Sequence, residues 1–117
     1  MAQYEDLTID QGADVAIQLE LLEKDGSIKN LVGFSAAAKM KRSYNADSDN
    51  TLAFTASITE LNAPLGILVL ELTNTQTNTL KSGRWVYDVE ISYQDSGSTI
   101  VERILEGNIE VTPSVTR

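Results

Sequence analysis

Apolar and polar side chains alternate along most of this chain. The clearest case is the segment 15–22, in which every odd-numbered residue is Val, Ile or Leu. Successive side chains of a β-strand point to opposite faces, so this period of two predicts a strand with one buried and one hydrated face. Asp25 and Gly26 follow, a pair that favours the positive φ angles of a tight turn. We therefore expect a hairpin or a short crossover after this strand.

Five further segments are expected to form strands. Four of them alternate, and one is a nearly continuous apolar run of the kind found in a central strand. They are the alternating segments 34–41, 52–58, 84–93 and 100–111 and the apolar run 67–72. Gly107 interrupts the last segment, and we expect a β-bulge or a bend there. Residues 73–81 are mostly Thr and Asn and predict a short helix or a loop, with a helical turn capped at 77–80.

Six or seven short strands at even spacing predict an all-β fold. We expect an immunoglobulin-like β-sandwich of about seven antiparallel strands, with a closed small barrel as the main alternative. The 117 residues are 42% hydrophobic and 22% charged, which fits one folded domain with its own core. There is no internal repeat and no linker, so residues 1–117 are expected to form a single immunoglobulin-like domain.

Charge and composition exclude several classes of partner and of catalytic site. Nine Lys and Arg against 17 Asp and Glu give a net charge of -8, which repels phosphate and anionic lipid. We therefore expect no nucleic-acid partner and no membrane partner. The chain has no His and no Cys, so common zinc sites, imidazole bases and Ser-His or Cys-His nucleophiles are excluded. We expect that the protein is not an enzyme, binds no cofactor, and has no catalytic or metal-binding residues.

Two acidic pairs require a closer look. Asp47 and Asp49 resemble the start of a calcium loop, but the sixth and twelfth positions of that loop are Leu52 and Ile58 in place of Gly and Glu. We interpret this segment as a hydrated turn.

Asp88 and Glu90 lie two residues apart on an expected strand, so their side chains share one face. Paired glycosidase carboxylates face each other across a cleft, an arrangement that two neighbours on a hydrated face do not provide. Cross-strand ion pairs with Arg84, Arg103 or Lys39 are the better interpretation.

Aromatic and basic side chains offer other candidates. Trp85 follows Gly83 at the start of a strand and is expected to fill the core between the sheets. Tyr44 and Tyr93 are the candidates for exposed rings that could stack on a carbohydrate. The outward face of the strand at 34–41 ends in a basic group, formed by Lys39, Lys41 and Arg42.

Several segments taken in order resemble a known family. The matching segments are 7–13, 25–34, 39–42, 80–90 and 103–117, the last with its Glu-Gly pair and its Pro-x-Val-Thr-Arg ending. Together they resemble a phage virion- and tail-associated family of immunoglobulin-like domains, akin to the N-terminal domain of siphophage baseplate upper proteins. The resemblance implies a structural protein with neither enzymatic activity nor a cofactor. Baseplate, tail tip, neck and capsid surface are all compatible with it.

The leading hypothesis is a phage virion structural protein that docks into a symmetric assembly. Sheet edges and the two tails, Met1 to Asp6 and Pro113 to Arg117, are the expected contact points. Its partners would be other virion proteins or further copies of itself, as a homo-oligomer. The polar N-terminus predicts no secretion signal, so we expect synthesis in the host cytoplasm and assembly into the virion. The alternative is a carbohydrate- or receptor-binding adhesion module that contacts a host-surface glycan.

Overall fold

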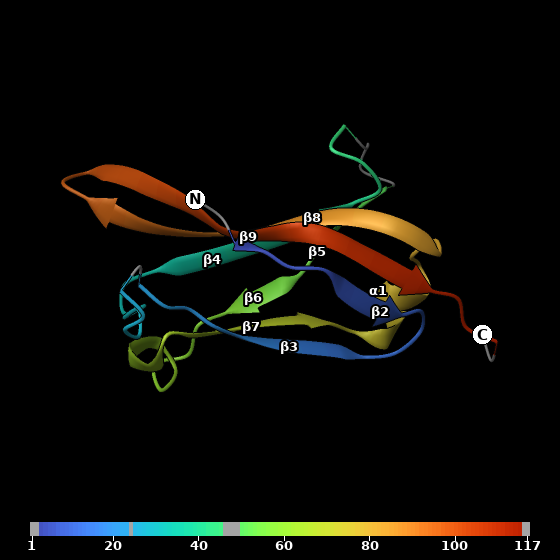
Figure 1. The fold of residues 1–117 in the computed structure, drawn as a ribbon, viewed down its shortest axis with the longest axis horizontal. Coiled ribbons are helices and arrows are strands. Elements are labelled where there is room, and N and C mark those ends of the chain that lie inside the picture. Colours follow the sequence, from blue (N-terminus) through green and yellow to red (C-terminus); the bar gives the residue numbers. More distant parts are fainter. Residues whose placement is uncertain (1–2, 24, 46–49, 116–117) are drawn as a thin grey trace.

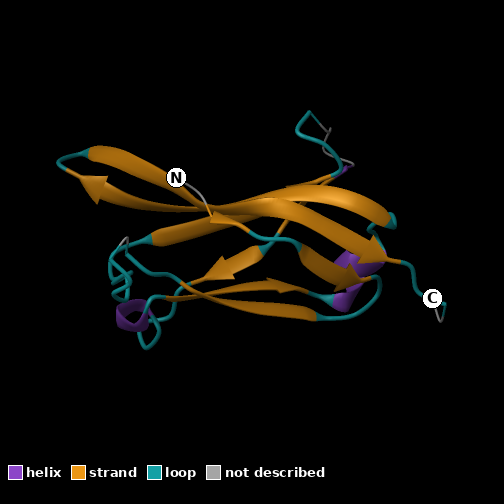
Figure 2. Cartoon of the chain, in the orientation of Figure 1, coloured by secondary structure: helices purple, strands orange, loops and turns teal. Residues whose placement is uncertain are grey.

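Two β-sheets pack face to face in the computed structural model, which describes residues 3–23, 25–45 and 50–115 (Figures 1 and 2). In this part of the chain, the larger sheet has the strand order β1-β9-β8-β4-β5, with β2 also paired to β9. The smaller sheet has the order β3-β7-β6. The strands are β1 (Gln3–Tyr4), β2 (Leu7–Asp10), β3 (Val15–Glu20), β4 (Ser35–Lys41), β5 (Thr51–Ala53), β6 (Thr55–Ser57), β7 (Ile67–Leu72), β8 (Gly83–Asp95) and β9 (Ser98–Thr112).

This strand order confirms the predicted immunoglobulin-like β-sandwich and excludes the closed barrel. One sheet contains β9, β8 and β4 extended by β5, and the other contains β3, β7 and β6, as in the variable-type arrangement of that fold. The described strand pairs are antiparallel except that β1 and β2 both run parallel to β9. A strand shows the same alternation of apolar residues whether it pairs in parallel or antiparallel. The sequence therefore did not predict the two parallel pairs.

The core lies between the sheets and is built by the alternate residues of each strand. β7 is the central strand of the smaller sheet, as its apolar run predicted, and its Leu68 and Leu70 are fully buried. Met40 from β4 and Val89 from β8 are fully buried on the facing sheet. Burial of one such side chain contributes about 1.5–3 kcal/mol to folding. The apolar residues that alternate along these strands are therefore the residues that form the core.

The segment 52–58 forms two short strands where one was expected. β5 pairs with β4 in the larger sheet, whereas β6 pairs with β7 in the smaller sheet. Phe54 lies between them, is buried, and donates its backbone N–H to the carbonyl of Ala38 at 3.0 Å. The chain therefore crosses from one sheet to the other at Phe54 without losing the alternation.

The β-bulge expected at Gly107 is found three residues earlier. Val89 pairs with Leu105 and Glu90 with Arg103, so Ile104 is the extra residue of β9. The bulge allows Ile104 and its neighbour Leu105 to face the core together. Gly107 instead lies in regular strand opposite Tyr87.

A short helix does form in the Thr- and Asn-rich stretch, one turn earlier than expected. α1 (Asn74–Asn78) is capped by Thr73, whose hydroxyl accepts from the Gln76 N–H while the Gln76 side chain accepts from the Thr73 N–H. Thr77 is fully buried and donates its hydroxyl to the carbonyl of Ala13 at 2.8 Å. Thr77 thus anchors the helix and does not cap it.

Candidate docking site

The hairpin of β8 and β9 extends past the rest of the larger sheet as a two-stranded arm (Figure 1). Pairing of β4 with β8 begins at Ser35 and Ser92, so the arm from Tyr93 onward has no third strand from β4. The arm ends in the turn between Asp95 and Ser98, where Ser96 and Gly97 both have positive φ angles. The sandwich therefore carries a projection whose backbone is bonded across the hairpin alone.

Two strand edges are open beside this arm. β1 pairs with β9 only from Leu105 onward, and in the described residues no strand pairs with the outer edge of β9 between Ser98 and Ile104. β3 pairs with β7 on one side and has no described strand on the other. Open edges offer unpaired N–H and C=O groups to a further strand. These edges are the features of the fold best suited to contact another chain.

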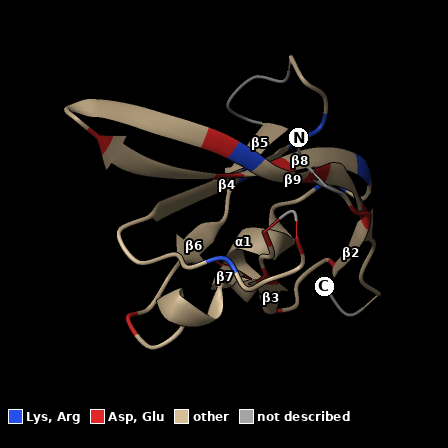
Figure 3. Ribbon diagram, turned by 60° about the vertical axis from the view of Figure 1, so that its left-hand side comes forward, with Lys and Arg blue, Asp and Glu red and all other residues tan. Residues whose placement is uncertain are grey.

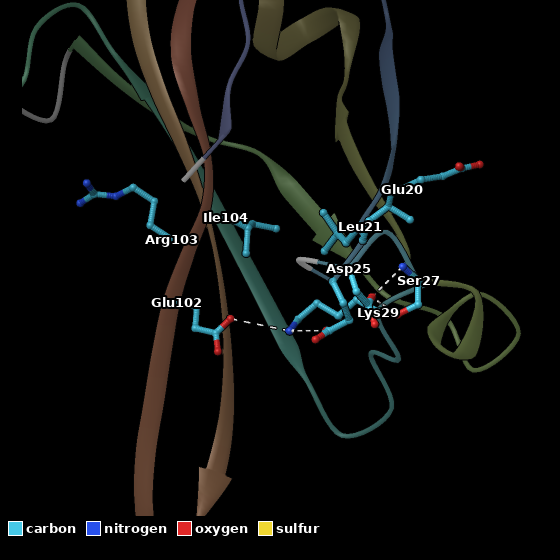
Figure 4. A pocket seen from close by; sticks show the side chains of 10 residues that line it. Glu20, Leu21, Asp25, Ser27, Lys29, Glu102, Arg103 and Ile104 are labelled. Carbon is cyan, nitrogen blue, oxygen red and sulfur yellow. Dashed lines mark hydrogen bonds and ion pairs between the residues drawn. The ribbon is translucent and has the colours of Figure 1, made fainter. Parts of the chain in front are cut away.

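A groove of about 1170 Å³ lies between the two open edges (Figure 4). One wall is β9 at residues 102–104, and the other is the end of β3 with the turn that follows it. Leu21 and Ile104 point toward each other across the groove (Figure 4). Both pack against a second hydrophobic cluster around Leu31, Ala63 and Ile91, which continues the core toward the arm. The groove thus has an apolar base.

Lys29 bridges the two walls of this groove. Its Nζ lies 3.1 Å from Glu23 Oε1 on one wall and 3.8 Å from Glu102 Oε2 on the other (Figure 4). The same ammonium group lies 5.5 Å from the centre of the Phe34 ring, and the side chain is 19% exposed. Lys29 therefore holds the β3–β4 connection against β9 and is already shared by two carboxylates.

The other charges of the groove are mainly negative. Asp25 adds a third carboxylate to those of Glu23 and Glu102. Glu20 borders the groove, but its side chain points away from it (Figure 4). The Ser27 hydroxyl and N–H donate to Asp25 at 2.6 and 2.9 Å and lower the pKa of this carboxyl below its usual range. Arg103 also borders the groove, but its side chain points away from it (Figure 4). Among the described residues, the inside of the groove therefore carries more carboxylates than cations.

The N-terminal segment is fixed over the far part of β9. The N–H of Glu5 donates to the carbonyl of Glu106 at 2.9 Å, and the Tyr87 hydroxyl donates to the carbonyl of Glu5 at 2.6 Å. Gly107 lies under this contact, and a methyl group there would overlap the Glu5 carbonyl. The tail expected at 1–6 is thus part of the larger sheet from Gln3 onward.

Tyr87→Phe should reduce the loss of stability at high pH. Burial, and then the charges of Glu5 and Asp6, raise the pKa of Tyr87 above its ordinary value near 10. Above pH 10 the unfolded chain ionises this phenol while the folded chain keeps it neutral, so the stability that it provides falls as the pH rises. Denaturant unfolding between pH 8 and 11 measures the slope. A variant as pH-sensitive as the wild type would contradict this assignment.

Three of the sequence candidates, Asp88, Trp85 and Arg42, have defined contacts in the structure. Asp88 does pair with Arg103 across the strands, at 3.4 Å, and Arg103 also reaches Glu106 at 3.6 Å. Trp85 is 2% exposed and belongs to the core cluster, as expected. Arg42 does not join an outward basic group, because its guanidinium donates to the Ser82 carbonyl at 2.9 Å and lies 5.7 Å from the Trp85 ring centre.

The structure does not bring the two candidate tyrosines together. Tyr44 lies in the connection after β4 and is 80% exposed. Tyr93 lies in the arm, is partly buried, and packs against Phe34 with ring centres 5.0 Å apart. Asp47 and Asp49, the calcium-loop candidates, lie outside the described residues. Lys29 and its two carboxylates are the site residues that the sequence analysis missed.

Acidic and basic residues occur on several elements of both sheets and on the connections between them (Figure 3). In the described ranges, no three His, Cys, Asp or Glu side chains gather in a way that could hold a metal ion. The helices in these ranges include none that is long and apolar enough to cross a membrane.

The architecture defines an immunoglobulin-like β-sandwich with a long hairpin arm and an acidic groove beside an open strand edge. Among solved structures, it is similar to the N-terminal domain of phage TP901-1 ORF48, with a TM-score of 0.59, 15% sequence identity, and coverage of 92% of this chain and 84% of that chain. It also matches AggA, the major subunit of aggregative adherence fimbriae type I from Escherichia coli, at 8% identity over 93% and 89% of the two chains, but the TM-score of 0.42 carries no argument. No protein-family model and no curated protein sequence match. A domain of a phage protein therefore shares this fold.

Proposed function

We propose that this protein is a phage virion structural subunit that docks into a symmetric assembly through its strand edges. The observation that carries the proposal is the open outer edge of β9 from Ser98 to Ile104, which borders a groove with an apolar base. Such an edge can accept a strand from a neighbour through main-chain hydrogen bonds, while a groove selects its side chains. The fold that it shares with a phage protein domain supports this role.

Two different open edges suit a repeating assembly. The outer edges of β3 and β9 belong to different sheets, so one copy can contact two neighbours at once. Head-to-tail contacts between unlike surfaces close into rings when the rotation is right, as a tail, neck or baseplate requires. A subunit attached to the capsid surface would need only one of these two strand edges for binding.

The termini contribute less than the sequence suggested. From Gln3 onward the N-terminal segment is already paired with β9, so it stabilises the sheet and is not free to bind a neighbour. At the other end, Ser114 is held by the side chain of Gln11, and Val115 is fully exposed. We therefore assign the docking role to the strand edges first. The adhesion role is the weaker candidate, because Tyr44 and Tyr93 do not form a common platform.

Mass spectrometry of purified virions tests the proposed function. We expect this chain among the particle proteins at a copy number comparable with other structural subunits, and resistant to removal by washing at moderate salt. An abundant host protein of similar mass serves as the control for carry-over. Absence from the particle, or presence only at the level of that control, would sink the proposal.

A further inference from the structure

We propose that the groove beside β9 receives an extended, positively charged segment of a neighbouring protein, which adds to β9 as a new strand. This inference rests on the proposed docking function and identifies the edge used and the chemistry of the partner. Its observations are the open edge from Ser98 to Ile104, the apolar base of the groove, and the excess of carboxylates in it.

The shape of the site suits a chain segment. A volume of about 1170 Å³ exceeds the range of about 300–1000 Å³ usual for small-molecule pockets. The seven residues from Ser98 to Ile104 offer an edge of about 23 Å at the usual rise of 3.3 Å per residue. An added strand of six or seven residues would match this edge.

The two kinds of groove surface select alternating side chains. Every second side chain of an added strand would face the groove, and there it meets the apolar contacts of Leu21 and Ile104. Leu22 is 58% exposed on the groove wall. A small or β-branched side chain on the added strand would cover part of this apolar surface.

The charges specify a cationic partner. Among the described residues, three carboxylates line the inside of the groove, those of Glu23, Asp25 and Glu102, and Lys29 is its one inward-reaching cation. Glu20 and Arg103 border the groove but point away from it (Figure 4). Glu23 and Glu102 share that cation, while Asp25 has no ion-pair partner among the described side chains. Lys or Arg on an added strand would supply the missing charge. A second copy of this chain is the less favourable occupant, because each copy carries a net charge of -8.

A peptide titration followed by NMR on the full chain tests this inference. The probe is a heptapeptide in which Lys alternates with Val and Thr, and the control peptide has Glu in place of each Lys. We expect the cationic peptide to shift the amide signals of residues 98–104 and to protect them from hydrogen exchange. Binding should weaken as salt is raised, because the pairs are partly exposed.

A matched pair of double variants separates charge from shape. Asp25→Asn with Glu102→Gln should weaken binding of the cationic peptide by about threefold to tenfold, the effect of losing two exposed ion pairs. Glu60→Gln with Glu71→Gln removes the same charge at exposed positions away from the groove and should leave binding unchanged. Equal binding of both peptides, equal binding by both double variants, or no protection of residues 98–104 would overturn the inference.

A second copy as the occupant has its own signature. Residues 98–104 would then be protected without peptide, and sedimentation velocity would show dimers at the concentration where protection appears. That result would also overturn the inference. Failure of the docking function itself is a separate result, because it is measured by the absence of the chain from virions and not by peptide binding.

Discussion

Gly107→Ala is expected to destabilise the fold by about 2–4 kcal/mol and to release the N-terminal segment from β9. A methyl group at Gly107 would overlap the carbonyl oxygen of Glu5 and press on the Tyr87 ring. Both neighbours are fixed, one as backbone and the other by its hydrogen bond to that same carbonyl. The overlap can therefore be relieved only by moving residues 3–10 away from the sheet.

Denaturant unfolding and hydrogen exchange measure the two parts of this result. Exchange should accelerate at the amides of β2 and Glu5 and remain slow at Val89 in the core. Gly97→Ala is the control, since a methyl group there meets nothing within 4 Å and the cost is limited to the positive φ angle, about 1–2 kcal/mol. A Gly107→Ala protein with normal protection of β2 would contradict the assigned role of Gly107.

The sandwich itself was predictable because its cause is local. One side of each strand faces the core, so the odd positions of β3, the odd positions of β8 from Trp85 to Tyr93 and the even positions of β7 are apolar in the sequence. The approximate positions of six strand segments and the central place of β7 follow from that period and from turn residues. The pairing partners, the strands β1 and β2, and the division of 52–58 into β5 and β6 are missing from such a pattern. The parallel addition of β1 and β2 to β9 is therefore a property of the folded chain alone.

Gly107 was correctly identified as a special position in the strand, but the structural reason predicted for it was wrong. A glycine inside a strand indicates a bulge or the close approach of another backbone. The sequence favoured the bulge, whereas the approaching backbone is that of Glu5, about one hundred residues away in the chain. The actual bulge, at Ile104, carries no glycine and no other local mark. Both outcomes depend on contacts between distant segments.

The groove was not predictable for a similar reason. Lys29 lies in an ordinary polar turn region, and its partner Glu102 belongs to a strand that is distant in sequence. Composition showed that the chain has an excess of negative charge. It did not show that four of the carboxylates border one groove. An open edge, likewise, is the absence of a neighbour, and this is defined only once the other strands are placed.

Trp85→Ala is expected to destabilise the protein by about 3–5 kcal/mol, the usual cost of removing a large buried aromatic side chain. Trp85 is 2% exposed, donates its indole N–H to the carbonyl of Lys81 at 2.9 Å, and lies beneath the guanidinium of Arg42. Circular dichroism during denaturant unfolding measures the loss without relying on indole fluorescence. Trp85→Phe should cost clearly less, because it keeps most of the ring volume and gives up the hydrogen bond. If Trp85→Ala unfolded like the wild type, the indole would not be a core residue, and a ligand-stacking role for it would have to be reconsidered.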